Sequence, residues 1–337
     1  MALISKKMGR VCLVLLLGLG AYLLQVKDLQ AKDKLLVVTS FSILQDMTQQ
    51  LAGDKAEVVS LVGVNEDSHT YQPKPSDSRK LTKADLVIEN GLEFEGWMDR
   101  LVAASGYKGL RVIAAQGIDL HQKESKASHD HDHDHDHDHD HDHDHDHDHD
   151  HDHDHDQARH QHGKYDPHAW QSLIAAQQYV SNIRDGLVKA DPKNQAYYKA
   201  QAAAYLERLQ ALHQAMLVRF EKLPADRRTV MTAHAAFGYL AADYGLNFVS
   251  PQGISTASEP SASEMARLIT QIQDQQVSAI FIENMANPRL VEQLRRETQI
   301  KLGGTLYSDA LSDASGNAAS YLKMMEHNLE TLLSALE

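Results

Sequence analysis

The chain has 337 residues, with 33 basic and 47 acidic side chains and a formal net charge of −14. Fourteen of the acidic residues belong to one tract, His129–Asp156, in which His and Asp alternate without interruption. Without that tract the acidic and basic counts are equal, at 33 each. This balance excludes a strongly basic surface of the kind that binds nucleic acid.

The N-terminus has the pattern of a secretory signal peptide. Three basic residues precede an apolar stretch, Val11–Leu24, which is shorter than the roughly 20 residues that a membrane-spanning helix requires. We expect residues 1–31 to be removed by cleavage after Ala31. The single cysteine, Cys12, lies at the start of the apolar stretch, so we expect an exported protein without a thiol, a disulfide or a lipid-anchor cysteine.

Short β-rich runs alternate with helical stretches such as Ser42–Ala52 and Ser76–Ala84, in two successive blocks of the chain. This alternation predicts an α/β fold with parallel sheets and helices on both faces, and its repetition predicts two similar (β/α)4 lobes. The expected strands are Leu35–Phe41, Glu57–Val62, Leu86–Gly91 and Arg111–Ala115 in the first block, and Thr229–Ala233, Asn247–Ser250, Ala279–Asn284 and Gly303–Tyr307 in the second.

A long helical segment connects the two blocks. Asp191 as its cap and Pro192 in its first turn predict where it begins, and its apolar residues continue to about Leu223. A helix of about 30 residues spans on the order of 45 Å, which favours a rigid connection over a flexible hinge. The expected division is an N-terminal lobe over 32–190, a linking helix over 191–223 and a C-terminal lobe over 224–337.

A low-complexity segment, 122–163, interrupts the first lobe and contains the His/Asp tract. Neutral imidazole and carboxylate bind divalent transition metals without any thiol. The tract has no apolar side chain, which predicts that it stays disordered without metal. A solvated acidic linker is the alternative, but a linker requires only charge and not His at every second position. We predict several weak metal sites along the tract.

Three of the eight other His residues are candidate ligands. His69 follows the second expected strand, His234 ends the first strand of the second block, and His168 lies in the segment that resumes after the tract. Ligands of open α/β sheets bind beyond the carboxyl ends of strands, so His69 and His234 lie where a site between the two lobes would be built. The same argument does not place His168. A fourth donor is then required, for which Glu283 and Asp309 are both candidates. We expect ordinary structural roles for the other five, His121, His160, His162, His213 and His327.

Four motifs of the chain resemble those of the zinc- and manganese-binding solute receptors of ABC importers. The resemblance implies two (β/α) lobes joined by one rigid helix, a single metal between the lobes, and no enzymatic activity. It also implies a monomeric periplasmic protein that works with a membrane permease. The motifs are Glu66–Pro73 with Pro75–Asp77, Asp166–Trp170, Thr232–Tyr239 and Leu306–Ser312.

Carried over by this resemblance, the ligands are His69 and His168 from the first lobe and His234 and Asp309 from the second. Asp309 is thereby preferred to Glu283. Three imidazoles and one carboxylate suit Zn²⁺ in near-tetrahedral geometry, whereas Mn²⁺ prefers more oxygen. Manganese-binding members tend to have a carboxylate where this chain has His234, and histidine-rich insertions are typical of the zinc branch. We therefore expect Zn²⁺, with Mn²⁺ or another divalent ion as the alternative cargo.

The predicted function is high-affinity zinc uptake, in which the tract collects Zn²⁺ and the cleft binds one ion tightly for the permease. A secreted zinc metallohydrolase is the main alternative from another class, and the sequence has no His-Glu-x-x-His motif to support it. A surface adhesin is a second alternative, which the position of Cys12 disfavours. One departure from the resemblance is Gln72, which stands where many relatives have an acid.

Overall fold

The computed structural model of the protein describes residues 34–119, 165–251, 253, 256, 262–285 and 288–337. The expected signal peptide and the His/Asp tract lie outside these residues, as do three of the set-aside histidines, His121, His160 and His162.

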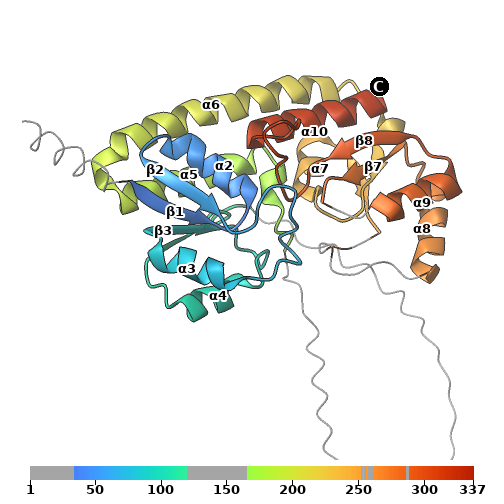
Figure 1. Ribbon diagram of the computed structural model, residues 1–337. Coiled ribbons are helices and arrows are strands. Elements are labelled where there is room, and N and C mark those ends of the chain that lie inside the picture. The colour runs from blue at the N-terminus through green and yellow to red at the C-terminus, as the bar shows by residue number, and fades with distance from the viewer. Residues whose placement is uncertain (1–33, 120–164, 252, 254–255, 257–261, 286–287) are drawn as a thin grey trace, which may run out of the picture.

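The first lobe is built on a parallel four-stranded sheet in the order β2-β1-β3-β4. Helices α2 and α5 pack on one face of this sheet, and α3 and α4 on the other (Figure 1). Strand β3 is buried along its whole length, because it is central and covered on both faces. The strands are β1 (Leu35–Thr39), β2 (Ala56–Ser60), β3 (Leu86–Glu89) and β4 (Leu110–Ile113), and the helices are α2 (Ser42–Ala52), α3 (Pro75–Lys83), α4 (Met98–Ser105) and α5 (Ala175–Ala190).

The second lobe repeats the same sheet order as β6-β5-β7-β8, again all parallel. The two similar lobes that the sequence predicts are therefore confirmed. The strands are β5 (Thr229–Met231), β6 (Asn247–Val249), β7 (Ala279–Glu283) and β8 (Leu302–Leu306), and the helices are α7 (Gly238–Tyr244), α8 (Ala262–Asp274), α9 (Pro288–Thr298) and α10 (Tyr321–Leu336). Short 3₁₀ turns in the described residues connect these elements: η1 (Ala169–Gln171) before α5, η2 (Pro192–Asn194) before α6, and η3 (Ala225–Arg227) before β5.

The expected long helix is present as α6 (Gln195–Phe220), which runs beside α10 along both lobes (Figure 1). It is shorter than the predicted 191–223 because a separate 3₁₀ turn occupies Pro192–Asn194. The carboxylate of Asp191 accepts hydrogen bonds from the Asn194 side chain at 2.6 Å and the Tyr198 hydroxyl at 2.7 Å, not from a backbone amide. The expected boundaries of the lobes stay a prediction.

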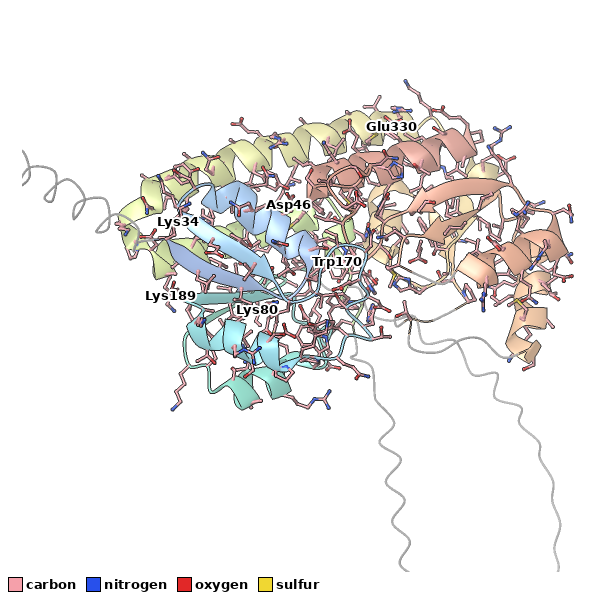
Figure 2. All side chains as sticks on the ribbon, viewed as in Figure 1. Lys34, Asp46, Lys80, Trp170, Lys189 and Glu330 are labelled. Carbon is pink, nitrogen blue, oxygen red and sulfur yellow. The ribbon has the colours of Figure 1, made fainter. Side chains whose placement is uncertain are left out.

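One hydrophobic core continues from the first lobe through α6 and α10 into the second lobe. A smaller, separate cluster lies between the second sheet and helices α8 and α9. Trp170 is fully buried where the lobes meet (Figure 2). Its indole donates a hydrogen bond to the Ser308 carbonyl of the second lobe at 2.8 Å, and Tyr321 of α10 donates to the Trp170 carbonyl at 2.5 Å. The two lobes therefore behave as one packed body.

Crossing a lipid bilayer requires a helix that is both long and apolar, and none of the helices in the described ranges meets both conditions.

Arg228 supports the junction at the end of α6. Its guanidinium donates to the carbonyls of Phe220 at 2.8 Å, Leu223 at 2.9 Å and Tyr244 at 3.2 Å. Carbonyls at helix ends have no intrahelical partner, and hydrogen bonds from charged donors are stronger than those from neutral donors.

We expect Arg228→Ala to lower the free energy of unfolding by about 2 kcal/mol, measured by urea titration of the metal-free protein. A loss below about 0.5 kcal/mol, the range typical of neutral surface changes, would contradict this role.

Candidate metal centre

The four predicted ligand side chains come from four separate segments of the chain. His69 lies in the loop between β2 and α3, and His168 immediately precedes η1. His234 lies in the loop between β5 and α7, and Asp309 follows β8. Because parallel strands end at the same edge of a sheet, the loops after β5 and β8 lie together at one edge of the second sheet. The loop after β2 lies at the equivalent edge of the first sheet. The structure brings all four side chains together.

The donor atoms of these residues lie at separations that suit a single ion. His69 Nε2 is 3.2 Å from His168 Nε2 and 3.3 Å from Asp309 Oδ2. His234 Nε2 is 3.2 Å from Asp309 Oδ2, and His168 Nε2 is 3.6 Å from Asp309 Oδ1. All the donors lie within 4.8 Å of one another. Neighbouring donors of a tetrahedral shell with bonds of about 2.0 to 2.1 Å are roughly 3.3 Å apart.

The interior position of the group makes a cation favourable. His168, His234 and Asp309 are fully buried, and the side chain of His69 is only 7% exposed. No solvent reaches either carboxylate oxygen of Asp309, and the neighbours of these oxygens are the imidazole nitrogens of the same group, at 3.2 to 3.6 Å. A buried carboxylate is costly unless a positive charge compensates it. A divalent cation bound by both oxygens or by one of them would compensate that charge.

The charges of the group perturb each other strongly. Burial alone would raise the pKa of Asp309, but the imidazoles of His234 and His168 hold it well below its usual range. Burial alone would lower the pKa of His234, but the carboxylates of Glu283 and Asp309 hold it well above its usual range. An imidazole must give up the proton on the nitrogen that binds a metal, so protons compete with a divalent cation here and metal binding is expected to weaken as the pH falls.

Two further carboxylates contact two of the imidazoles at Nδ1, the ring nitrogen that does not face Asp309. His168 Nδ1 lies 2.7 Å from Asp166, and His234 Nδ1 lies 2.5 Å from Glu283. The same carboxylates accept the backbone amides of these two histidines, at 3.0 and 2.9 Å. A carboxylate at Nδ1 keeps the proton there and leaves the Nε2 lone pair for a metal. Glu283, which the sequence left open as a fourth donor, therefore lies behind His234. The supporting place of Asp166 was not predicted from the sequence, where its position two residues before His168 was the available signal.

His69 is held differently. The Asp67 carboxylate accepts its backbone amide at 2.8 Å and, through its other oxygen, the hydroxyl of Thr256 of the second lobe at 2.7 Å. The imidazole packs edge-on against Phe94, with ring centroids 4.8 Å apart. Its orientation therefore depends on an aromatic contact as well as on the loop backbone.

The two described histidines that were set aside lie outside this group. His213 Nδ1 is 3.1 Å from the Tyr244 hydroxyl, and His327 Nε2 is 3.0 Å from the Thr305 carbonyl. Both therefore have ordinary hydrogen-bonding roles.

Glu95, the residue after Phe94, is a buried acid whose hydrogen bonds hold the loop that carries both residues. Glu95 accepts hydrogen bonds from the Ser40 hydroxyl at 2.5 Å and from the amides of Asn90 at 2.7 Å and Gly91 at 3.1 Å. Burial raises the pKa of Glu95 to about 7 in spite of these bonds. This side chain is therefore expected to change its charge near neutral pH.

The raised pKa of Glu95 predicts a pH-dependent stability. The folded chain binds the Glu95 proton more tightly than the unfolded chain, so its contribution is complete below about pH 4.5 and is lost as the pH rises through about 7. A shift of this size corresponds to about 3 kcal/mol. Metal-free wild type and Glu95→Gln should be unfolded with urea at pH 5 and pH 8.5. We expect the loss of stability between these pH values to be smaller in the variant, and equal losses would contradict the assignment.

The fold and the buried His₃Asp group, His69, His168, His234 and Asp309, define a two-lobed protein with a candidate metal site where its lobes meet. Residues 37–335 match the sequence profile of the family described as zinc-uptake complex component A, periplasmic. The chain therefore belongs to this family of metal-binding receptors of ABC importers, whose members bind a metal ion for a membrane permease and are not enzymes.

Individual relatives carry different metals in their names. The chain is 30% identical to the metal ABC transporter substrate-binding lipoprotein FimA of Streptococcus parasanguinis, over 91% of this chain and 90% of that protein. It is 29% identical to the manganese ABC transporter substrate-binding lipoprotein PsaA of Streptococcus pneumoniae, over 96% and 95%. Its structure resembles that of the periplasmic zinc binding protein TroA of Treponema pallidum, with a TM-score of 0.75, 28% identity and coverage of 90% and 99%.

Two of these relatives are named lipoproteins. Their names count against the expectation, drawn from the position of Cys12, that this protein lacks a lipid anchor. Cys12 itself lies outside the described residues.

Proposed function

We propose that this protein is the receptor of a high-affinity zinc importer, with His69, His168, His234 and Asp309 as the ligands of one Zn²⁺. The observation that carries the proposal is the buried group of three imidazole nitrogens and one carboxylate at the junction of the lobes. Four protein donors leave no evident position for a reactive water, so the group suits capture of an ion better than hydrolysis. The bound Zn²⁺ would be the cargo that a permease receives.

The choice of zinc rests on the donors. Three imidazoles with a single carboxylate form a borderline set that Zn²⁺ accepts in near-tetrahedral geometry. Carboxylates behind His168 and His234 increase the basicity of these ligands and fix their tautomers. The name of TroA, which is similar in structure, also supports zinc.

Manganese is the second candidate cargo, and one observation favours it. Both oxygens of Asp309 face imidazole nitrogens, Oδ2 toward His69 and His234 and Oδ1 toward His168. If both oxygens bind the ion, the donor number rises to five and the share of oxygen increases, which Mn²⁺ tolerates better than a strict tetrahedron. The name of PsaA, a manganese ABC transporter substrate-binding lipoprotein, agrees with this alternative.

The ligand assignment is tested by metal retention. Protein purified without chelator and without an immobilised-metal step should retain one tightly bound Zn²⁺, measured by elemental analysis after removal of weakly bound ions. We expect His234→Ala to lose this ion, because the variant retains only three donors and leaves Glu283 without its imidazole partner. His213→Ala is the matched control, since it removes a buried, hydrogen-bonded histidine outside the group. Full retention by His234→Ala would refute the assignment, and retention of Mn²⁺ instead of Zn²⁺ would favour the alternative cargo.

We further propose that the His/Asp tract collects Zn²⁺ weakly and raises its concentration near the His₃Asp group. The support is compositional, namely 14 imidazoles and 14 carboxylates in an unbroken alternation. Buffering or sensing of zinc is the rival role for the same segment.

The protein is further expected to be exported and to work as a monomer.

Deletion of residues 122–163 separates these roles. If the tract collects zinc, cells that carry the deletion should import zinc normally when it is plentiful and poorly when it is scarce, because only dilute zinc has to be concentrated. Uptake of radioactive zinc at both concentrations measures the difference. Equal uptake by the wild type and the deletion at both concentrations would eliminate collection, and a loss only on sudden zinc excess would favour buffering.

A further inference from the structure

The two sheets share a sequence at equivalent positions. Strand β3 ends with Ile88-Glu89 and is followed by Asn90, and strand β7 ends with Ile282-Glu283 and is followed by Asn284. Each strand is the third along the chain in its lobe and has a central place in its sheet. Asp309 follows the fourth strand of the second lobe directly, and His168 lies beyond the fourth strand of the first lobe, where the described chain resumes at residue 165.

Asn90 holds the segment that contains His168. Its side chain is fully buried, and its amide nitrogen donates to the carbonyl of Pro167 at 3.0 Å. Its amide oxygen accepts the hydroxyl of Tyr179 at 2.5 Å. Because the carbonyl of Pro167 can only accept a hydrogen bond, the amide nitrogen of Asn90 faces Pro167, the residue immediately before the histidine, and the amide oxygen faces Tyr179.

Asn284 makes the corresponding contact in the second lobe. Its amide nitrogen donates to the carbonyl of Ala310, the residue immediately after Asp309, at 3.2 Å. The same nitrogen is 3.3 Å from the side-chain oxygen of Asn65, whose backbone amide donates to Leu311 at 2.9 Å. Asn284 therefore contacts the Asp309 segment and the loop that leads to His69.

The glutamates of the two repeats do not share a role. Glu89 binds the guanidinium of Arg111 at 2.6 Å on its own sheet, whereas Glu283 lies behind His234. Only the asparagines make the same bond in both lobes, from a side-chain amide to the backbone carbonyl beside a candidate ligand. This shared bond distinguishes them from residues that only complete the fold.

We propose that Asn90 and Asn284 are equivalent positioning residues, which fix the backbone next to His168 and Asp309 so that both ligands meet one ion. The inference rests on the proposed function, because it takes these two residues as ligands. Partners outside the ligand shell orient the ligands, and their loss typically weakens metal binding about 10- to 100-fold. A donor group that is free to shift by a fraction of an ångström no longer matches the geometry of the ion.

The test compares three single variants with the wild type, namely Asn90→Ala, Asn284→Ala and the matched control Asn182→Ala. Asn182 also donates from its side-chain amide to backbone carbonyls, those of Ala114 at 2.8 Å and Gln116 at 2.9 Å, but away from the His₃Asp group. The affinity for Zn²⁺ and for Mn²⁺ is measured by competition with a chelator. The visible spectrum of bound Co²⁺ reports coordination geometry, and the thermal midpoint of the metal-free protein reports stability.

We expect metal affinity about tenfold weaker or more in both test variants, together with a changed Co²⁺ spectrum. The control should keep the affinity and the spectrum of the wild type even if its thermal midpoint falls. If the test variants lose only thermal stability, and keep affinity within twofold and the spectrum unchanged, the inference is wrong. Asn284 is only partly buried, so Asn284→Ala tests the inference if Asn90→Ala does not fold. A wild type that binds Mn²⁺ but not Zn²⁺ would refute the zinc proposal alone, and the same comparison with Mn²⁺ would still test the asparagines.

Discussion

The carboxylate of Asp309 lies in the protein interior, out of reach of solvent, with three imidazole nitrogens around it. Its negative charge is compensated by protons on the imidazoles or by a cation that replaces them. The surrounding structure holds the four side chains in this arrangement from loops of both lobes. Metal capture therefore depends on the backbone that places Asp309, and not only on the chemistry of the ligands.

Each lobe helps to hold the ligand segment of the other. The indole of Trp170 and the amide of Gln171 donate to the Ser308 carbonyl, next to Asp309. In return, the Tyr239 hydroxyl of the second lobe donates to the Asp166 carbonyl, two residues before His168. Separation of the lobes would break these bonds and divide a hydrophobic core that both lobes share.

The electrostatic surroundings of the three imidazoles are unequal. His168 and His234 each have a carboxylate at the outer ring nitrogen, whereas the carboxylate nearest His69 accepts its backbone amide and the hydroxyl of Thr256. His69 also retains some solvent exposure, and the other two do not. The group therefore has a part that carboxylates hold at the outer ring nitrogens, His168 and His234, and a part nearer the surface, His69.

The sequence alone determined the strand order along the chain, the repetition of the lobes and the positions of the candidate ligands, because hydrophobic periodicity and short motifs are local properties. It did not decide between Glu283 and Asp309 without a family resemblance, since both lie at strand ends. It also missed Asp166, Asn90 and Asn284 as supporting residues. Only the tertiary structure decided that Glu283 stands behind His234 while Asp309 faces the three imidazoles. The physical reason is that the pairing of parallel strands and the packing of the two lobes set these distances between segments far apart in the chain.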